Sequence, residues 1–340
     1  MDFDLSEEQR LLKDSIDGLL ADAYDFDKRK LYMKEKGGWS RTMWSKLAEQ
    51  GLLGLPFSED DGGFGAGGVE TMIVMEAMGR ALVLEPYLAT VVLSGGFLRH
   101  GGSAAQKAAH LPGIIDGSKT FAFAQLEKQS RYDLFDVAAS AKKKGDGWVL
   151  DGEKFVVLNG ENADTLIVTA RTSGGQRDKS GIGVFIVPAD AKGVTRKGYP
   201  TQDGLHAADI TFTGVEVGVD SVIGDPAGGL PLIERVVDEA RIALCAEAVG
   251  LMDESLKSTV EYIKTRKLQH RASDMFVALE QARSMSMFAT MAAEFDDAKE
   301  RATSIAAAKV QIGKSAKFVG QQSVQLHGGI GVTMEAKIGH

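Results

Sequence analysis

The hydrophobic period changes twice along the chain, and this constrains the fold more than any other feature. Up to about residue 117, apolar residues recur at helical spacing, as in the run 69–78. From about 118 to 222, short β-rich runs follow one another, separated by turns such as 144–147. From about 228 to 340 the helical period returns. Because few helical stretches lie between the β-rich runs, the pattern does not favour a doubly wound parallel sheet.

These three zones predict an α+β multidomain chain. An N-terminal all-helical domain is expected over 1–117, a middle antiparallel β-sandwich or barrel domain over 118–227, and a C-terminal helical bundle over 228–340. The bundle is expected to hold helices over Leu230–Lys267, Ala272–Phe295 and Glu300–Leu326. The predicted strands are Thr120–Gln125, Val137–Ala141, Trp148–Leu150, Phe155–Leu158, Thr165–Ala170, Ile182–Val187 and Asp209–Phe212.

Charge and hydropathy exclude several classes of protein. The 340 residues carry 39 basic and 47 acidic side chains, a net charge of −8, whereas a general nucleic-acid binder needs a basic face. No apolar run reaches the length of a membrane span. The first ten residues, MDFDLSEEQR, are acidic and polar, unlike a signal peptide. We therefore expect a cytoplasmic protein that binds neither nucleic acid nor membrane.

Metal and nucleophile motifs give no functional assignment. The single cysteine, Cys245, lies in an apolar run and allows neither an internal disulfide nor a cysteine metal site. The six histidines show neither H-x-x-x-H nor H-E-x-x-H spacing, so no metal site is predicted. The G-x-S-x-G and P-loop motifs of hydrolases and phosphoryl-transfer enzymes do not occur.

Two glycine clusters stand out. The run from Gly63 to Gly68 matches G-x-G-x-x-G, but no β-run precedes it and Asp60 and Asp61 would repel a pyrophosphate, so a loop before a helix is predicted. The second cluster, QLHGGIG over 325–331, ends a long helix. A helix C-cap needs one glycine, and the additional ones suit a close approach of backbone to a ligand.

A charged pair near the start of the third zone has two explanations. Asp238 and Arg241 are spaced i,i+3 on the first long helix, so a surface ion pair explains them as well as a ligand contact does.

Three stretches, taken with the order of the zones, resemble the acyl-CoA dehydrogenase family over nearly the whole chain. They are the outline of Leu52–Leu82, the hairpin strand WVLDGEKFVVLNG over 148–160, and the glycine cluster over 325–331. The hairpin and the glycine cluster together make the resemblance specific.

The resemblance implies a flavoenzyme in which FAD lies between the β domain and the bundle. A neighbouring subunit closes the site in a dimer or tetramer, either homomeric or hetero-oligomeric, and an electron-transfer flavoprotein or similar protein accepts the electrons. Asp238 and Arg241 match positions that contact the nucleotide end of acyl-CoA. The matching cofactor positions are Leu126, Val156, Val157, Leu158, Arg266, Gln325, His327, Gly328 and Gly329.

The implied reaction is α,β-dehydrogenation of an acyl-CoA thioester. A carboxylate removes the α proton while the β hydrogen leaves as hydride, and hydrogen bonds hold the thioester oxygen. No catalytic base is assigned. In most members it is a Glu well past the glycine cluster, beyond His340, and Glu335 comes too early. In a minority it occupies the position of Ala240, and Glu239 points about 100° away on a helix.

Several positions depart from the family pattern. Leu126 and Tyr132 replace hydroxyl-bearing residues, Leu158 replaces a threonine and Val156 a tryptophan, so flavin contacts would depend more on backbone amides. The usual Q/T-F-G run after Arg266 is absent, and the chain is shorter than the resemblance leads one to expect. The bundle is thus expected to be truncated. Missing residues and a real deletion both remain open.

Two other functions remain open. One is a partner subunit of a hetero-oligomeric dehydrogenase, which completes a neighbour's FAD site with little catalysis of its own; it resembles the small subunits of paired bacterial enzymes. The other is a relative that binds flavin for another purpose, including a DNA-associated member. The net charge of −8 weighs against the latter.

Overall fold

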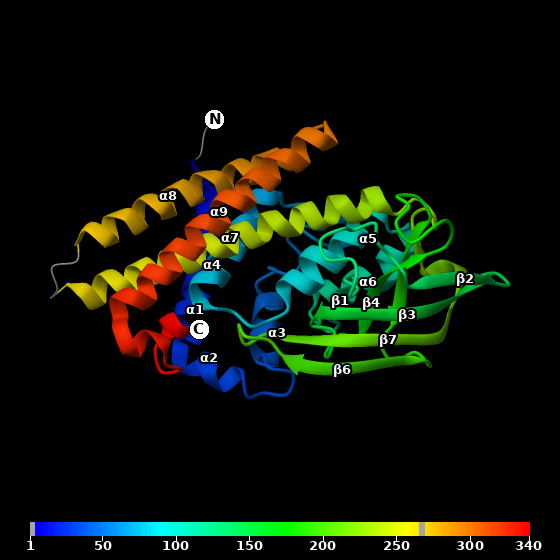
Figure 1. Ribbon diagram of the computed structural model, residues 1–340, viewed down its shortest axis with the longest axis horizontal. Helices are drawn as coiled ribbons and strands as arrows, with labels where there is room; N and C mark the ends of the chain where they lie inside the picture. Colours follow the sequence, from blue (N-terminus) through cyan, green and yellow to red (C-terminus); the bar gives the residue numbers. More distant parts are fainter. Residues whose placement is uncertain (1–3, 265–268) are drawn as a thin grey trace. The chain divides into compact units, whose positions relative to one another are not determined.

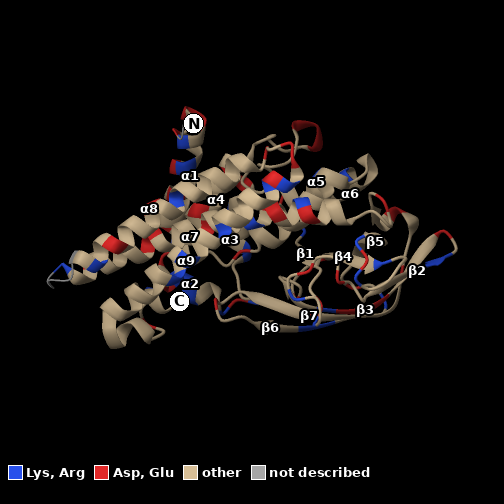
Figure 2. Ribbon diagram, turned by 45° about the horizontal axis from the view of Figure 1, so that its top comes forward, with Lys and Arg blue, Asp and Glu red and all other residues tan. Residues whose placement is uncertain are grey.

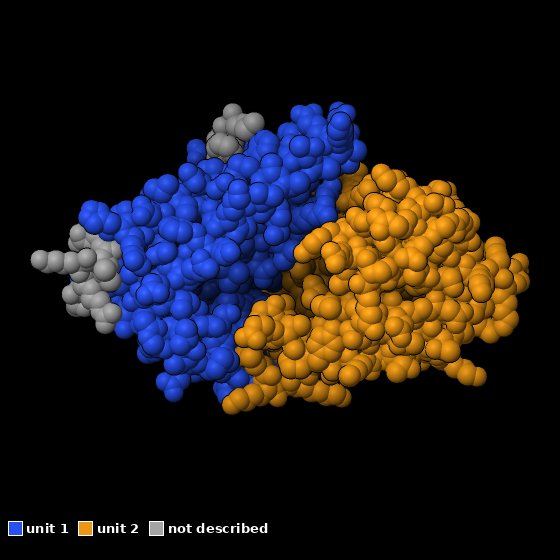
Figure 3. Space-filling model, in the orientation of Figure 1, with its two compact units in different colours: residues 1–32, 66–83, 238–340 blue, residues 33–65, 84–237 orange. Residues whose placement is uncertain are grey.

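The computed structural model describes residues 4–264 and 269–340. They fall into two compact units, each assembled from separate stretches of chain (Figure 3). Unit 1 comprises the described parts of 1–32, 66–83 and 238–340, and unit 2 comprises 33–65 and 84–237. Helices at both ends of the chain and a sheet between them confirm the predicted fold class (Figure 1). The boundaries expected near 117 and 227 stay predictions.

The N-terminal zone is helical, as predicted. Helix α1 begins at a capping box, in which the Ser6 hydroxyl accepts from the Gln9 amide and the Gln9 side chain accepts from the Ser6 amide. The helices are α1 (Glu7–Ala23), α2 (Phe26–Tyr32), α3 (Arg41–Glu49), α4 (Gly68–Ala81), η2 (Leu88–Ser94), α5 (Gly95–Gly101) and α6 (Ala104–Ile115). A 3-10 turn, η1 (Glu59–Asp61), precedes the first glycine cluster, in place of the strand that a dinucleotide fingerprint requires.

The middle zone forms one connected sheet of eight strands among the described residues. Its order is β6-β7-β3-β2-β4-β5-β8, and β1 pairs with β4. Most pairings are antiparallel, whereas β4 pairs in parallel with β1 and with β2. The strands are β1 (Phe121–Ala124), β2 (Ser140–Lys144), β3 (Gly147–Leu158), β4 (Thr165–Arg171), β5 (Ile182–Pro188), β6 (Val194–Pro200), β7 (His206–Val217) and β8 (Val222–Ile223).

The sheet curls around its own core. The rings of Trp148 on β3 and Phe185 on β5 meet with centroids 5.6 Å apart, although two strands separate β3 from β5 in the sheet. The apolar faces of β1 to β5 and β7 therefore pack against one another, with Leu150, Val168 and Ile210 fully buried. This core fixes the strands that carry the candidate site.

Strand β3 is longer than predicted, because the two expected runs are one twelve-residue strand. Its pairing with β7 shifts register twice, between Leu150 and Gly152 and again between Lys154 and Val157. These are β-bulges, which interrupt the alternation that a sequence pattern relies on.

Within the described residues, the C-terminal zone is a bundle of three long helices. These are α7 (Leu230–Ile263), α8 (Gln269–Ala292) and α9 (Ala298–His327), followed by the short turns η4 (Gly328–Val332) and η5 (Lys337–Gly339). Buried apolar residues from all three helices form one cluster, which includes Val249, Leu279 and Ile312. Each helix lies within a few residues of its prediction.

Helices α4 and α7 of unit 1 cross with their backbones in contact. A Cβ added to Gly250 on α7 would overlap the carbonyl oxygen of Glu76 on α4, and one added to Gly79 on α4 would overlap the carbonyl oxygen of Glu247 on α7. Each helix thus contributes a glycine where the other passes closest. Only glycine permits this approach.

Charged side chains of both signs are interspersed along the helices and strands (Figure 2). Within the described residues, no helix combines the length and hydropathy needed to cross a membrane.

Candidate functional site

The second bulge of β3 carries the residues predicted to border the flavin. Val157 is buried, whereas Val156 is 46% exposed and Leu158 is half-buried. Val156 has φ +49°, in the left-handed region that β-branched residues avoid. The bulge therefore presents the side chain of Val156 outward and takes its backbone out of the regular ladder.

Hydrogen bonds hold this bulge from both sides. The Phe155 amide donates to the Leu126 carbonyl oxygen at 2.8 Å, and the Val156 amide donates to Asp209 Oδ1 at 3.2 Å. The first bond places Leu126 beside β3. The structure thus brings together in unit 2 the four cofactor positions predicted there, Leu126 and residues 156–158.

A buried ion pair lies directly behind this segment. Lys154 is fully buried, and its Nζ donates to Glu127 Oε1 at 2.7 Å, to Thr169 Oγ1 at 3.0 Å and to the Gln125 carbonyl oxygen at 3.2 Å. Glu127 also accepts from the Ala138 amide at 2.8 Å. Because Glu127 follows Leu126 and Lys154 precedes Phe155, the pair joins the two segments that carry the predicted cofactor contacts.

The environment keeps the Glu127 carboxylate ionised. Burial alone would raise its pKa, but the charge of Lys154 and the hydrogen bonds from Lys154 and Gln129 outweigh it and lower the pKa. A lowered folded-state pKa adds stability above the ordinary value of 4.5, and this stability is lost as the pH falls through the lower folded value. The Glu127 carboxylate is therefore charged at neutral pH.

The end of α9 carries the second group of predicted cofactor residues. Gln325 is exposed, and His327 is buried. His327 Nδ1 lies 2.9 Å from the Ser323 carbonyl oxygen, and its ring stacks on Tyr262 with centroids 4.4 Å apart. Since a carbonyl only accepts, Nδ1 carries the proton and the ring orientation is fixed. Gly328 ends the helix with φ +65°.

The predicted substrate residues pair with each other. Arg241 donates to Asp238 Oδ1 at 2.7 Å on α7, with the Asp238 side chain 8% exposed and that of Arg241 40% exposed. Arg266 lies outside the described residues. Asp238 and Arg241 belong to unit 1, as do Gln325, His327, Gly328 and Gly329.

These residues fit a flavin nucleotide. A flavin ring presents apolar faces and a polar edge, so its site needs exposed apolar side chains beside backbone polar groups. Val156, flanked by the half-buried Leu126 and Leu158, supplies the apolar surface. At Gly328 and Gly329, an added Cβ would meet no atom within 4 Å, so backbone there is open to a ligand. Each segment, taken by itself, thus fits a contact with a flavin nucleotide.

Sequence reasoning missed Glu127, Lys154 and Asp209. The two members of the ion pair are 27 residues apart, and a charged residue in a strand ordinarily indicates an exposed face. The local pattern gave no signal for Lys154 either, because Asp151, Gly152 and Glu153 precede it directly.

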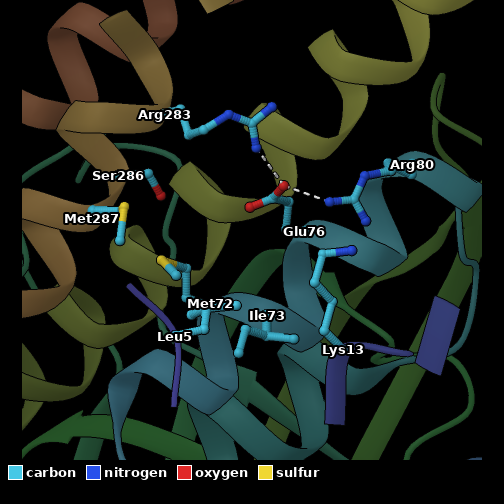
Figure 4. A pocket seen from close by; sticks show the side chains of 9 residues that line it. All are labelled: Leu5, Lys13, Met72, Ile73, Glu76, Arg80, Arg283, Ser286 and Met287. Carbon is cyan, nitrogen blue, oxygen red and sulfur yellow. Dashed lines mark hydrogen bonds and ion pairs between the residues drawn. The ribbon is translucent and has the colours of Figure 1, made fainter. Parts of the chain in front are cut away.

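A cavity of about 160 Å³ in unit 1 contains none of the predicted site residues. At its wall Glu76 Oε1 accepts from Arg80 at 2.5 Å and from Arg283 at 2.8 Å (Figure 4). These bonds tie α4 to α8. The lining residues are Leu5, Lys13, Met72, Ile73, Glu76, Arg80, Arg283, Ser286 and Met287.

The buried thiol of Cys245 is expected to be unreactive. Burial raises the pKa of this thiol to about 11, so it stays protonated at neutral pH and is a poor nucleophile.

Comparison with known proteins matches all three zones to one family. The N-terminal domain of acyl-CoA dehydrogenase matches residues 6–118, the middle domain 122–215 and the C-terminal domain 227–340. The probable acyl-CoA dehydrogenase YngJ of Bacillus subtilis (strain 168) is 29% identical, over 98% of this chain and 91% of that protein.

Solved structures agree. One from Acidaminococcus fermentans, described in work on its electron transferring flavoprotein, superposes with a TM-score of 0.90 at 26% identity, over 99% of this chain and 92% of that one. The crystal structure of an FAD-dependent dehydrogenase superposes with a TM-score of 0.87 at 26% identity, over 100% of this chain and 92% of that one. The alternative of a partner subunit with little catalysis is not favoured by these matches. The chain therefore belongs to the acyl-CoA dehydrogenase family of FAD-dependent oxidoreductases, which act on the CH–CH bond of acyl-CoA.

Proposed function

We propose that this chain is itself a working acyl-CoA dehydrogenase, which holds FAD and removes two hydrogens from the α and β carbons of an acyl-CoA thioester. The observation that carries the proposal is the second bulge of β3. The bulge exposes the side chain of Val156 beside Leu126 and Leu158. The buried ion pair of Lys154 and Glu127 joins the two segments that carry these residues. A subunit that had lost its cofactor would have no need for such a strained, apolar, outward-facing segment.

The other site residues are assigned by the same proposal. Arg266 binds the flavin pyrophosphate from across the dimer, a role for which the fork of a guanidinium is suited. Gln325, His327, Gly328 and Gly329 contact FAD of a neighbouring subunit. Asp238 and Arg241 contact the nucleotide end of the substrate, and their mutual ion pair holds the arginine in place.

Bound FAD supplies the acceptor for two electrons. The protein must orient the thioester so that the α C–H faces a carboxylate and the β C–H faces the flavin. Hydrogen-bond donors at the thioester oxygen stabilise the negative charge that develops as the α proton leaves. Since Leu126 and Leu158 offer no hydroxyl, backbone amides of their segments are the proposed donors toward the flavin.

The proposal extends to the partners. We infer that an electron-transfer flavoprotein or a similar carrier reoxidises the flavin, in a cytoplasmic homo- or hetero-oligomer. The match to a structure described in work on the electron transferring flavoprotein of Acidaminococcus fermentans supports such a carrier.

Turnover of acyl-CoA tests the proposal. The purified protein, loaded with FAD, is incubated with a panel of straight, branched and ring-bearing acyl-CoA thioesters and an artificial electron acceptor. Mass spectrometry is expected to detect, for at least one of them, a product two hydrogens lighter, formed over many turnovers. Without the acceptor, the product should not exceed one molecule per flavin. Absence of product from every thioester, with FAD bound, would contradict the proposal.

A further inference from the structure

Asp209, on the outer face of the sheet, bonds to both strands that neighbour its own. It lies on β7, which runs between β6 and β3 (Figure 1). The register places it opposite the second bulge of β3. Its Oδ1 accepts from the Val156 amide at 3.2 Å and from the Tyr199 hydroxyl at 2.8 Å. One carboxylate oxygen thus links three neighbouring strands at the point where β3 leaves its regular pairing.

The link compensates for an unfavourable backbone conformation. Val156 has φ +49°, which a β-branched residue adopts only when the surrounding structure enforces it. The bulge also removes the Val156 amide from the ladder between β3 and β7. A charged acceptor for that amide makes a stronger bond than a carbonyl would, so Asp209 favours the conformation that the strand alone disfavours.

Tyr199 orients the carboxylate. Burial and the neighbouring Asp209 raise the pKa of Tyr199, so its hydroxyl stays protonated and donates. Asp209 therefore accepts one hydrogen bond from β3, on one side of β7, and one from β6, on the other side.

We propose that Asp209, oriented by Tyr199, is a positioning residue for the flavin: by accepting the Val156 amide it holds the bulge in the conformation that presents residues 156–158 to the cofactor. The inference rests on the proposed function, and it gives Asp209 a role that acts through the backbone of Val156.

The same pair of strands offers a matched control. At the first bulge of β3, Asp151 Oδ1 accepts from the Gly214 amide of β7 at 2.7 Å. This bond also joins an aspartate to a backbone amide across β3 and β7, but it lies away from residues 156–158. A general weakening of the sheet would follow from losing either bond, whereas loss of flavin positioning would follow only from losing the bond of Asp209.

The experiment titrates FAD into apoprotein and follows flavin fluorescence. Asp209→Ala is expected to raise the dissociation constant of FAD about tenfold, whereas Asp151→Ala leaves it within about twofold. Asp209→Asn, which keeps an acceptor oxygen, should recover most of the affinity. Hydrogen exchange of the Val156 amide should accelerate in Asp209→Ala and stay slow in Asp151→Ala.

The outcomes separate the inference from the proposed function. Equal FAD affinity in Asp209→Ala and Asp151→Ala, with the unaltered chain binding FAD, would overturn the inference alone. Failure of the unaltered chain to bind FAD would overturn the proposed function and the inference with it. If Asp209→Ala does not fold, Tyr199→Phe decides: a weaker affinity for FAD supports the inference, and an unchanged affinity overturns it.

Discussion

Lys154→Met is expected to lower the free energy of unfolding by about 3–5 kcal/mol, because it leaves Glu127 as an unpaired charge in a dry environment. Lys154 is fully buried and Glu127 is 4% exposed, so water cannot replace the lost partner. The cost exceeds any gain from burying the apolar methionine, since a buried carboxylate must either stay charged without a counterion or bind a proton. Urea titration at neutral pH measures the change.

Two further variants test the reason for this effect. Lys154→Met combined with Glu127→Gln removes both charges and should recover a good part of the lost stability. Lys144→Met removes a lysine from the same sheet whose pair with Glu216 is largely exposed, and stability should barely change. A loss from Lys154→Met no larger than from Lys144→Met would show that the buried pair does not hold the two cofactor segments together.

Gly250→Ala is expected to destabilise unit 1 by about 2 kcal/mol, the balance of two opposing effects. Alanine gains about 1 kcal/mol over glycine in a helix interior. The added methyl group, however, overlaps the carbonyl oxygen of Glu76 and lies 2.9 Å from the Arg80 amide nitrogen, both of them backbone atoms of α4. Backbone atoms cannot rotate away as a side chain would, so the two helices must separate and their shared packing is lost.

Gly313→Ala is the matched control for this prediction. Gly313 lies in the interior of α9, and a Cβ there would meet nothing within 4 Å. The same substitution should therefore raise stability by about 0.5–1 kcal/mol. Thermal unfolding of the two variants should shift in opposite directions. Equal shifts would mean that close contact between α4 and α7 does not limit the residue at position 250.

The sequence pattern was sufficient for the long helices and the buried strands. The bundle helices have regular apolar spacing, and β4 and β5 are nearly continuous apolar runs, so length and period identify both types. The pattern failed for β6, which is an edge strand with little buried surface, and for the two-residue β8. It also divided β3, because a bulge shifts the alternation from one face to the other.

For the site, the resemblance identified the segments that carry the candidate residues, but not the contacts that hold those segments in place. The motif around Val156 and Val157 can be read along the chain. The Lys154–Glu127 pair and the Val156–Asp209 bond instead join residues 27 and 53 positions apart. Such contacts depend on strand order and register, and above all on the second bulge of β3, which no local pattern encodes. No catalytic base is assigned among the described residues.

Anaerobic spectroscopy shows whether this chain transfers hydrogen from an acyl-CoA to its own FAD. Purified protein should be yellow, and an acyl-CoA that it accepts should bleach the oxidised flavin band at ~450 nm without any other protein present. Retention of the full band with every acyl-CoA, or a colourless protein that FAD does not reconstitute, would show that the chain does not carry out this transfer.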